Sequence, residues 1–476
     1  MLENPLIQRY RKSLIRPKQF WVYQVVYACI VGLIMLISYL IYYQPPKDGR
    51  EFFSSTYYQF LTFQILILWF WGGYNSGSAI RNELIRKTYD FFKLLPMTAH
   101  QKAAGILIGR NLVMLLFACY NFIFLVIFGV LGGLNSGLQG QIFFVILSLA
   151  LLFNTLALLS AMRVDGKNMQ TSATPLILLG LICTPFVIGI VASLSESGIF
   201  NLSIRFYALS VPALLMIAFV ALYFCCWSFI GIIRKLTSER EPLFTYFGSM
   251  SFLVGYGLLT CGLFWVYLLE KKMMTLYFLW LVLLIPVLLI PFGAVKTCDV
   301  YLERFRSSKR GLSTGKMHWR LFTNSNLFLC LSLLGIWGLF SAGMGLSVDS
   351  LFIPSIIVLL SFCLFLALLF EMHTVYQPLY GKIKLLLGFI ALLYAFLPLI
   401  LAPILTNDGV LQYSPLGYVF YLFEKADVGQ KVDFASSVFI MNLVLCTVPI
   451  GLIWQRYRQI LRARRRIWEK ELTIEY

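Results

Sequence analysis

Twelve apolar runs, each long enough to cross a bilayer as a helix, restrict the fold of this chain more than any other feature. A spanning helix needs about 20 consecutive apolar residues, because the hydrocarbon core is about 30 Å thick and a helix rises about 1.5 Å per residue. Charged residues make up 13% of the 476 residues, against roughly 25% in soluble domains, and the runs lack the alternation of barrel strands. We therefore predict an all-α polytopic membrane protein with about 12 transmembrane helices. The runs lie at 21–43, 57–75, 106–131, 141–162, 173–194, 209–233, 248–269, 276–295, 326–346, 351–372, 385–405 and 436–454.

Lysine and arginine are distributed unevenly among the connections between these runs. Of the 39 Lys and Arg residues, 31 lie in the N-terminal segment, the even-numbered connections and the C-terminal segment. Basic residues accumulate on the cytoplasmic side of membrane proteins, so we expect both termini to be cytoplasmic. The net charge of +18 is then an orientation signal that requires no nucleic-acid partner. The first run is too long for a signal-peptide core and no cleavage site follows it, which favours a multi-pass protein of the cell (inner) membrane.

The segments at the two ends of the chain are both basic and amphipathic. Residues 1–20 place Leu6, Tyr10, Leu14 and Ile15 on one side, among basic side chains. This pattern is typical of a helix that lies in the membrane interface, and we expect the chain to turn into the membrane at Pro17. Residues 455–476 predict a second helix of this kind, which binds anionic lipid or a partner.

The remaining chain is predicted to form two six-span halves, residues 21–233 and residues 234–454. Their long cytoplasmic connections, 76–105 and 296–325, fall at corresponding places, after the second span of each half. Neither half contains a large soluble domain. Internal repeats of this kind are common in transporters, although identity between these halves is too weak to prove duplication.

The spans carry few residues that could perform chemistry. No span has Lys, Asp or Glu near its middle, and Arg110 and Glu371 sit near cytoplasmic ends. Proton-coupled carriers keep such costly charges because their function needs them, so this pattern argues against one. The three histidines lie far apart, without a second ligand at metal spacing. We expect no catalytic residue, no metal and no cofactor in this chain, and no ATPase of its own.

A polytopic membrane enzyme, such as a lipid-linked glycosyltransferase or polymerase, is the competing class. Asp48 and Glu51 lie in the first outer connection, where some membrane glycosyltransferases carry a catalytic acid, but that connection is too short for a sugar-binding cleft. This alternative predicts that activity depends on polar residues of the outer face: Asp48, Glu51, Arg205, Asp408 and Glu424. A non-transporting membrane scaffold is the third class.

The connection between the second and third spans has the pattern of an amphipathic helix outside the membrane. Apolar side chains recur there at helical spacing, among basic ones, over residues 79–95, and Pro96 ends the pattern. Thr98 followed by Gln101 forms a capping-box pattern, so we expect the third spanning helix to begin near Thr98. Gly105 and Gly109, four residues apart, would allow another helix to approach closely.

This connection resembles that of the ABC transporter type 2 permeases, the membrane subunits of ATP-driven exporters. Lys87 stands where the family has Gly, and Ile106 stands where it has Lys. Residues 414–427 resemble the short helix that the family places between its fifth and sixth spans, and residues 1–20 resemble its elbow helix. The positions that match the family's connection are Glu83, Thr88, Leu94, Leu95, Pro96 and Gly105.

The resemblance implies a permease that separate cytoplasmic ABC ATPase subunits drive, with two ATPase copies below the twelve spans of one chain. A pathway formed by a second copy of this chain is the alternative arrangement. Membrane lipids are the other expected partners. The aromatic content of 16% and the absence of fixed charge suggest a lipid-like or amphipathic cargo. The residues that the resemblance assigns to ATPase docking are Glu83, Lys87, Thr88, Phe91, Phe92, Leu94, Leu95 and Pro96.

Overall fold

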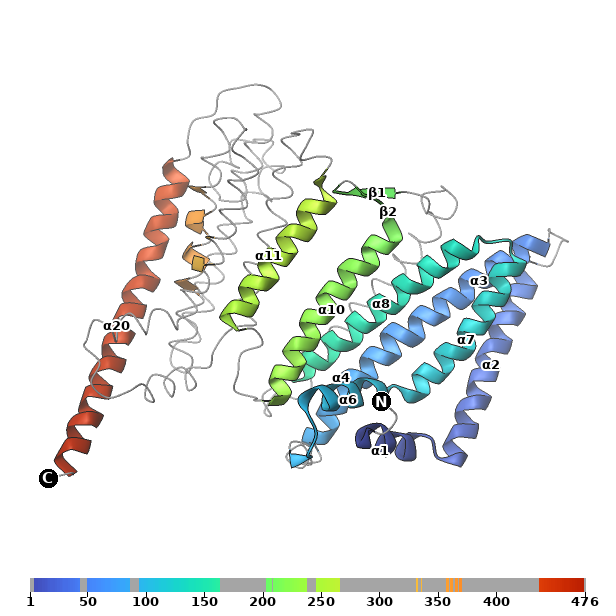
Figure 1. Cartoon of the computed structure of the whole chain (residues 1–476), viewed down its shortest axis with the longest axis horizontal. Coiled ribbons are helices and arrows are strands. Elements are labelled where there is room, and N and C mark those ends of the chain that lie inside the picture. Colours follow the sequence, from blue (N-terminus) through green and yellow to red (C-terminus); the bar gives the residue numbers. More distant parts are fainter. Residues whose placement is uncertain are drawn as a thin grey trace, which may run out of the picture. The chain divides into compact units, whose positions relative to one another are not determined.

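The structure is a computed structural model of the whole chain, and it contains two compact units, Met1–Glu239 and Arg240–Tyr476. We call them unit 1 and unit 2 and describe each by itself (Figure 1). The residues that the structure describes are 4–42, 49–85, 94–162, 203–207, 209–237, 245–265, single residues and short stretches between 331 and 369, and 436–474.

Five helices in the described residues are long and apolar enough to cross a membrane. The structure is therefore that of a helical, membrane-embedded protein. Four of these helices belong to unit 1, and each overlaps a predicted apolar run. The fifth, in unit 2, is the segment Val438–Arg456 of a longer helix. The four in unit 1 are α2 (Pro17–Tyr42), α7 (Leu112–Leu131), α8 (Ser136–Ala161) and α10 (Ala213–Thr237).

A short helix, α1 (Pro5–Leu14), precedes α2. Asn4 caps it by accepting a hydrogen bond from the backbone N–H of Leu6. Pro5 occupies the first turn, where a backbone N–H would form no hydrogen bond within the helix, so proline is tolerated there. The chain leaves the helix at Ile15, and α2 begins at Pro17. Proline disfavours helical geometry in the residue before it, which explains the break. The start of a new helix at Pro17, which the sequence predicts, is thus confirmed.

The second predicted run lies in a continuous helical rod built from three consecutive elements. These are α3 (Gly49–Ile65), the π-helical segment η1 (Leu66–Trp71) and α4 (Gly72–Ile85). Helix α4 packs closely on α8 at Gly72, where a Cβ atom would lie 2.7 Å from Oδ1 of Asn154. A larger residue at position 72 would therefore require the side chains of Asn154 and Met114 to shift. The periodicity of the sequence does not predict the π-helical segment.

The third predicted run lies in a second rod, which consists of α6 (Ala99–Arg110) and α7, and these two helices meet at Asn111. Thr98 and Gln101 form the predicted capping box: the Thr98 side chain accepts from the Gln101 backbone N–H at 3.2 Å, and the Gln101 side chain accepts from the Thr98 N–H at 3.0 Å. The predicted start of this rod is confirmed. Because α6 begins well before the apolar run, the rod extends beyond the span.

A two-stranded antiparallel hairpin precedes α10 and departs from the all-helical prediction. Strand β1 (Ser203–Phe206) pairs with β2 (Leu209–Pro212). Tyr207 follows β1 with a positive φ of 54°, the left-handed conformation that tight hairpin turns require. The predicted sixth span, 209–233, therefore begins as a strand and becomes helical only at Ala213. Apolar composition alone does not distinguish the residues of the hairpin from those of the spanning helix.

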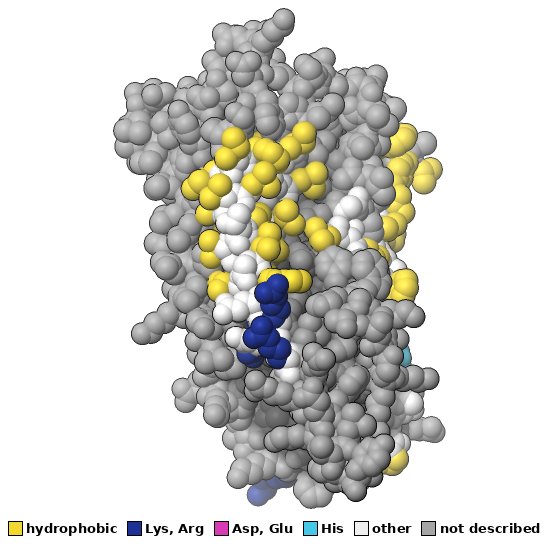
Figure 2. Space-filling model, turned by 90° about the vertical axis from the view of Figure 1, so that its left-hand side faces the viewer, with side chains coloured by type: hydrophobic (Ala, Val, Ile, Leu, Met, Phe, Trp, Pro, Cys, Tyr) yellow, Lys and Arg dark blue, Asp and Glu magenta, His cyan; other side chains and the backbone are white. Residues whose placement is uncertain are grey.

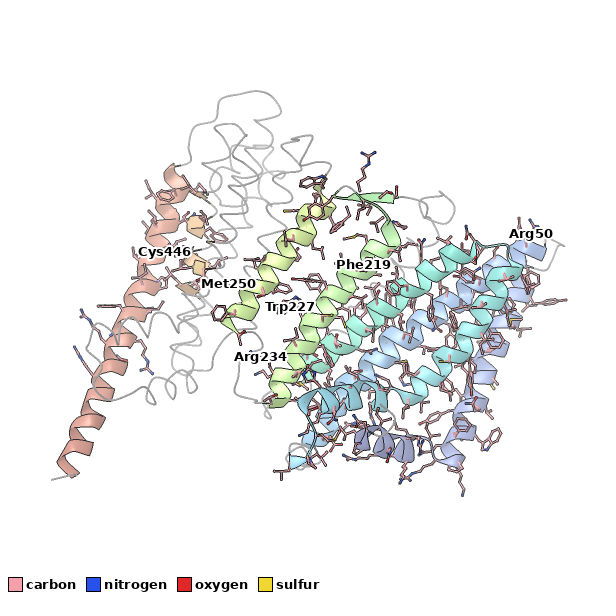
Figure 3. All side chains as sticks on the ribbon, in the orientation of Figure 1. Arg50, Phe219, Trp227, Arg234, Met250 and Cys446 are labelled. Atoms are coloured by element: carbon pink, nitrogen blue, oxygen red, sulfur yellow. The ribbon has the colours of Figure 1, made fainter. Side chains whose placement is uncertain are left out.

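In unit 1, the elements outside the spans gather at two opposite ends of the bundle (Figure 1). Helices α1 and α6 lie at one end, with the C-terminal ends of α4 and α10, and we call this the α1 end. The hairpin and the start of α3 lie at the other. Arg50 and Arg234 mark the two ends in Figure 3. A set of buried apolar residues, the junction cluster, joins five helices at the α1 end: Leu6, Ala79, Ile80, Ala103, Ile106, Leu158 and Ile232.

In the described part of unit 2, α11 (Tyr246–Leu263) is a shorter apolar helix that Thr245 caps by accepting from the Gly248 N–H at 2.9 Å. Helix α20 (Ser436–Ile474) is continuous from the predicted last span into the predicted tail, so no break separates the two at residue 455. Apolar side chains cover its first part and arginine side chains follow, as Figure 2 shows. The other predicted spans, and residues 414–427, lie wholly or mostly outside the described residues.

Candidate functional site

The candidate site lies at the α1 end, where α1 crosses α6. A Cβ atom at Gly105 would lie 3.0 Å from Cβ of Leu6, and one at Gly109 would lie 2.7 Å from Cδ2 of Tyr10. Only glycine allows the two helices to approach this closely without a shift. The prediction that these glycines admit a neighbouring helix is confirmed, and the neighbour is α1.

The apolar side of α1 packs against protein. Leu6, Ile7 and Tyr10 are buried, and Leu6 belongs to the junction cluster. The Nδ2 atom of Asn4 also donates to the backbone carbonyl of Gln101 on α6 at 2.7 Å. The sequence predicts a helix with its apolar side in the membrane interface; in the structure, α6 and its neighbours cover that side. Amphipathicity shows that a face is buried, but it does not identify what covers that face.

An ion pair links the exposed side of α1 to α4. Nη2 of Arg9 lies 3.0 Å from Oε1 of Glu83, and the two side chains are 52% and 12% exposed. Glu83 is one of the predicted docking residues. Its carboxylate is directed toward α1, where it holds α1 to the C-terminal part of α4. Because Arg9 is half exposed, solvent screens the pair and limits its contribution to stability.

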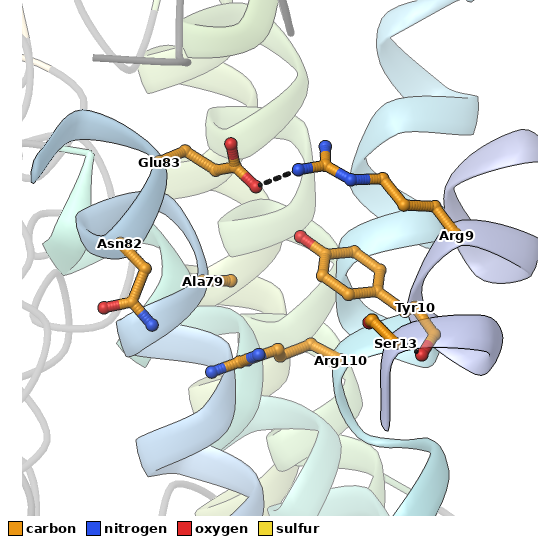
Figure 4. A pocket seen from close by; sticks show the side chains of 7 residues that line it. All are labelled: Arg9, Tyr10, Ser13, Ala79, Asn82, Glu83 and Arg110. Atoms are coloured by element: carbon orange, nitrogen blue, oxygen red, sulfur yellow. Dashed lines mark hydrogen bonds and ion pairs between the residues drawn. The ribbon is translucent and has the colours of Figure 1, made fainter. Parts of the chain in front are cut away.

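A cavity of about 150 Å³ lies beside this ion pair, between α1, α4 and α6 (Figure 4). The side chain of Arg110 extends into the lining from α6, and its Nε atom is buried without a hydrogen-bond partner among the described residues. Burial raises the pKa of Tyr10, the charge of Glu83 raises it further, and Arg9 and Arg110 oppose the rise. The phenol therefore stays protonated at neutral pH. The lining residues are Arg9, Tyr10, Ser13, Ala79, Asn82, Glu83 and Arg110.

The other predicted docking residues divide into two groups. Leu94 is 80% exposed and Pro96 is exposed, whereas Leu95 is half buried and packs against the junction cluster. The bend at 94–96 therefore presents one leucine to the outside and anchors the next. The predicted helix 79–95 is described only at its two ends, in α4 and at Leu94 and Leu95. Outside the described residues lie Lys87, Thr88, Phe91 and Phe92.

The sequence does not predict that Arg9, Tyr10, Asn82 and Arg110 belong to this site. Arg9 contributes to the orientation signal, Arg110 stands out only for its place in the third span, and Tyr10 is one residue of an apolar face. Asn82 belongs to no pattern in the sequence that indicates a function. The spacing of Gly105 and Gly109 is the one local feature that points to this contact.

No metal site is evident in the described residues, since no group of three or more His, Cys, Asp or Glu side chains is placed to hold an ion there. Comparison with known proteins finds no matching protein-family model, no matching curated protein and no matching solved structure.

Proposed function

We propose that the chain is the permease subunit of an ABC type 2 exporter, which moves a lipid-like or amphipathic cargo with energy from separate ATPase subunits. In this proposal twelve spans form two halves, and both termini are cytoplasmic. One ATPase copy binds at the α1 end, and a second copy binds at the corresponding cytoplasmic end of the second half. The pathway forms within one chain; its formation by two copies is the alternative. The proposal places the protein in the cell (inner) membrane as a multi-pass subunit.

The bend at Leu94 and Leu95 carries the proposal. Helix α4 ends at Ile85 and α6 begins at Ala99, so the bend lies between two rods that each continue into the bundle. The Leu94 side chain is exposed for contact with a soluble partner, while Leu95 packs on the junction cluster. A partner that moved this bend would displace both rods, which is how an ATPase could act on the spans.

Replacement of Leu94 with Asp tests the proposal directly. A charged side chain disfavours an apolar contact with an ATPase, so we expect loss of the ATPase from the purified complex and loss of ATP-driven cargo movement in vesicles. Phe92→Asp should have the same effect. The ATPase for this test is to be sought in the neighbouring reading frame, as a soluble protein with a Walker A loop, and expressed together with this chain.

Leu209→Asp is the matched control, because Leu209 is also an exposed leucine outside the spanning helices, 68% exposed in strand β2 at the opposite end of unit 1. It should leave ATPase binding intact. Equal loss with Leu94→Asp and Leu209→Asp would contradict the proposal. Full biological activity of the isolated chain, in vesicles without any nucleotide hydrolase, would also contradict it and would favour the membrane enzyme.

A further inference from the structure

The cavity between α1, α4 and α6 carries more positive than negative charge. Among the described residues, two guanidinium groups line it, those of Arg9 and Arg110, but one carboxylate, that of Glu83. Glu83 forms its ion pair with Arg9. The described lining residues together therefore carry one net positive charge, beside Arg110.

Arg110 has an unsatisfied group at this position. Its Nε atom is buried and has no hydrogen-bond partner in the part of the chain that the structure describes. Buried polar groups are almost always paired, because a buried donor without an acceptor loses its hydration without compensation. The group that satisfies Arg110 must accept hydrogen bonds, and negative charge on it would balance the excess.

Neutral donors complete the lining. The amide of Asn82 carries two N–H donors, and the hydroxyl of Tyr10 is directed toward the space between Arg9 and Glu83 (Figure 4). Guanidinium groups pair well with phosphate oxygens, because their N–H groups form a planar fork that matches two oxygens at once. A cavity of about 150 Å³ has the volume of several waters at about 30 Å³ each. It is therefore large enough for a phosphate group.

The position of the cavity indicates the source of the phosphate. Helix α2 begins its crossing at Pro17, directly after α1, and the basic side chains of this segment are exposed. Exposed basic residues beside the start of a spanning helix attract anionic lipids to that surface. The residues are Arg11, Lys12, Arg16 and Lys18.

We propose that this cavity binds the phosphate of an anionic lipid headgroup, with Arg110 and Arg9 as its ligands. A headgroup phosphate with one negative charge balances the excess charge of the lining. The bound lipid also contacts α1, α4 and α6 together, so it stabilises the packing of α1 at the α1 end. This inference does not depend on ATPase docking and can fail or succeed independently of it.

The test measures lipid binding by the purified full chain after removal of native lipid. Native mass spectrometry with added phosphatidylglycerol, compared with phosphatidylcholine, should show preferential retention of phosphatidylglycerol. Arg110→Gln should weaken this retention by at least about tenfold, the equivalent of one charge-assisted hydrogen bond. Arg205→Gln is the matched control, because Arg205 is an exposed arginine in strand β1 at the opposite end of unit 1 and does not line the cavity. It should retain the wild-type preference.

Ser13→Leu is a second variant that keeps every charge, because the leucine would fill the cavity from its exposed rim. It should also abolish the preference, and it keeps the test valid if Arg110→Gln does not fold. Inorganic phosphate in place of lipid distinguishes the two sources: competition with phosphatidylglycerol at millimolar concentration supports the phosphate site but assigns it to a free anion. Equal binding of both lipids by the wild type, or equal loss in Arg110→Gln and Arg205→Gln, overturns the proposal.

Discussion

The Nδ2 atom of Asn111 donates a hydrogen bond to Oγ of Ser76 at 2.8 Å, and both side chains are buried. Asn111 is the joint between α6 and α7, and Ser76 lies in α4. Nδ2 also donates to the carbonyl of Leu107 at 2.8 Å, so the same amide connects the joint to its own helix and to the neighbouring rod. The rod of α3, η1 and α4 is thus held to the rod of α6 and α7 near the α1 end.

Ser76→Ala should loosen this connection. The mutation leaves the Asn111 amide with one of its two acceptors, and we expect a loss of about 0.5–1.5 kcal/mol in the free energy of unfolding, the usual value of one hydrogen bond. Unfolding in mixed micelles with increasing denaturing detergent measures it. Ser54→Ala is the control, because within the described part of the chain that hydroxyl bonds only to the carbonyl of Glu51 in its own helix. A loss no larger than that of Ser54→Ala would argue against a stabilising role for the bond.

Gly109→Leu should separate α1 from α6. Even a Cβ atom at this position would lie 2.7 Å from the Tyr10 ring and 3.3 Å from Cα of Ile7, so the larger side chain requires α1 to move. Overpacking of this kind costs about 1–3 kcal/mol. Limited trypsin digestion should then cleave faster at Arg9, Arg11 and Lys12. Gly140→Leu, where a Cβ atom meets nothing within 4 Å, should digest like the wild type.

Exchange of the charges at Arg9 and Glu83 should show whether the pair itself holds α1. Arg9→Glu and Glu83→Arg should each speed tryptic release of the N-terminus, because each places like charges together. The double variant should recover part of the loss. A coupling energy of about 0.2–1 kcal/mol is expected for a pair with one half-exposed partner, and salt should reduce it. Simple addition of the two single effects would show that the pair makes no contribution.

The packing of α1 should weaken at alkaline pH through Tyr10. The folded state raises the pKa of this phenol above its ordinary value of 10.0, because burial and the nearby Glu83 disfavour the phenolate. The resulting stabilisation is complete below about pH 10 and is lost as the pH rises toward the folded-state pKa. Release of the N-terminus by a protease active at high pH, compared between pH 9 and pH 11, measures the change. Tyr10→Phe should show a smaller increase than the wild type, and an equal increase would assign the effect to other groups.

Short-range pattern in the sequence determines several local features of this protein. The apolar runs predict the spanning helices because the bilayer demands a minimum length of apolar sequence. The break at Pro17 and the capping box at Thr98 depend on residues one to three positions apart, so they too are readable from the chain. The close approach at Gly105 and Gly109 is predictable for the same reason, because the two glycines lie on one side of a single helix.

Only the tertiary structure decided which segments meet at the α1 end. Arg9 and Glu83 are separated by 74 residues, and nothing in either local pattern identifies the other as its partner. The apolar side of α1 indicates burial, but its contact with α6 depends on how the rods pack. The hairpin β1–β2 and the π-helical segment escape prediction as well, because apolar composition is shared by strand, α-helix and π-helix. Periodicity along the chain specifies which faces are covered, whereas the identity of the covering surface arises from packing between distant segments.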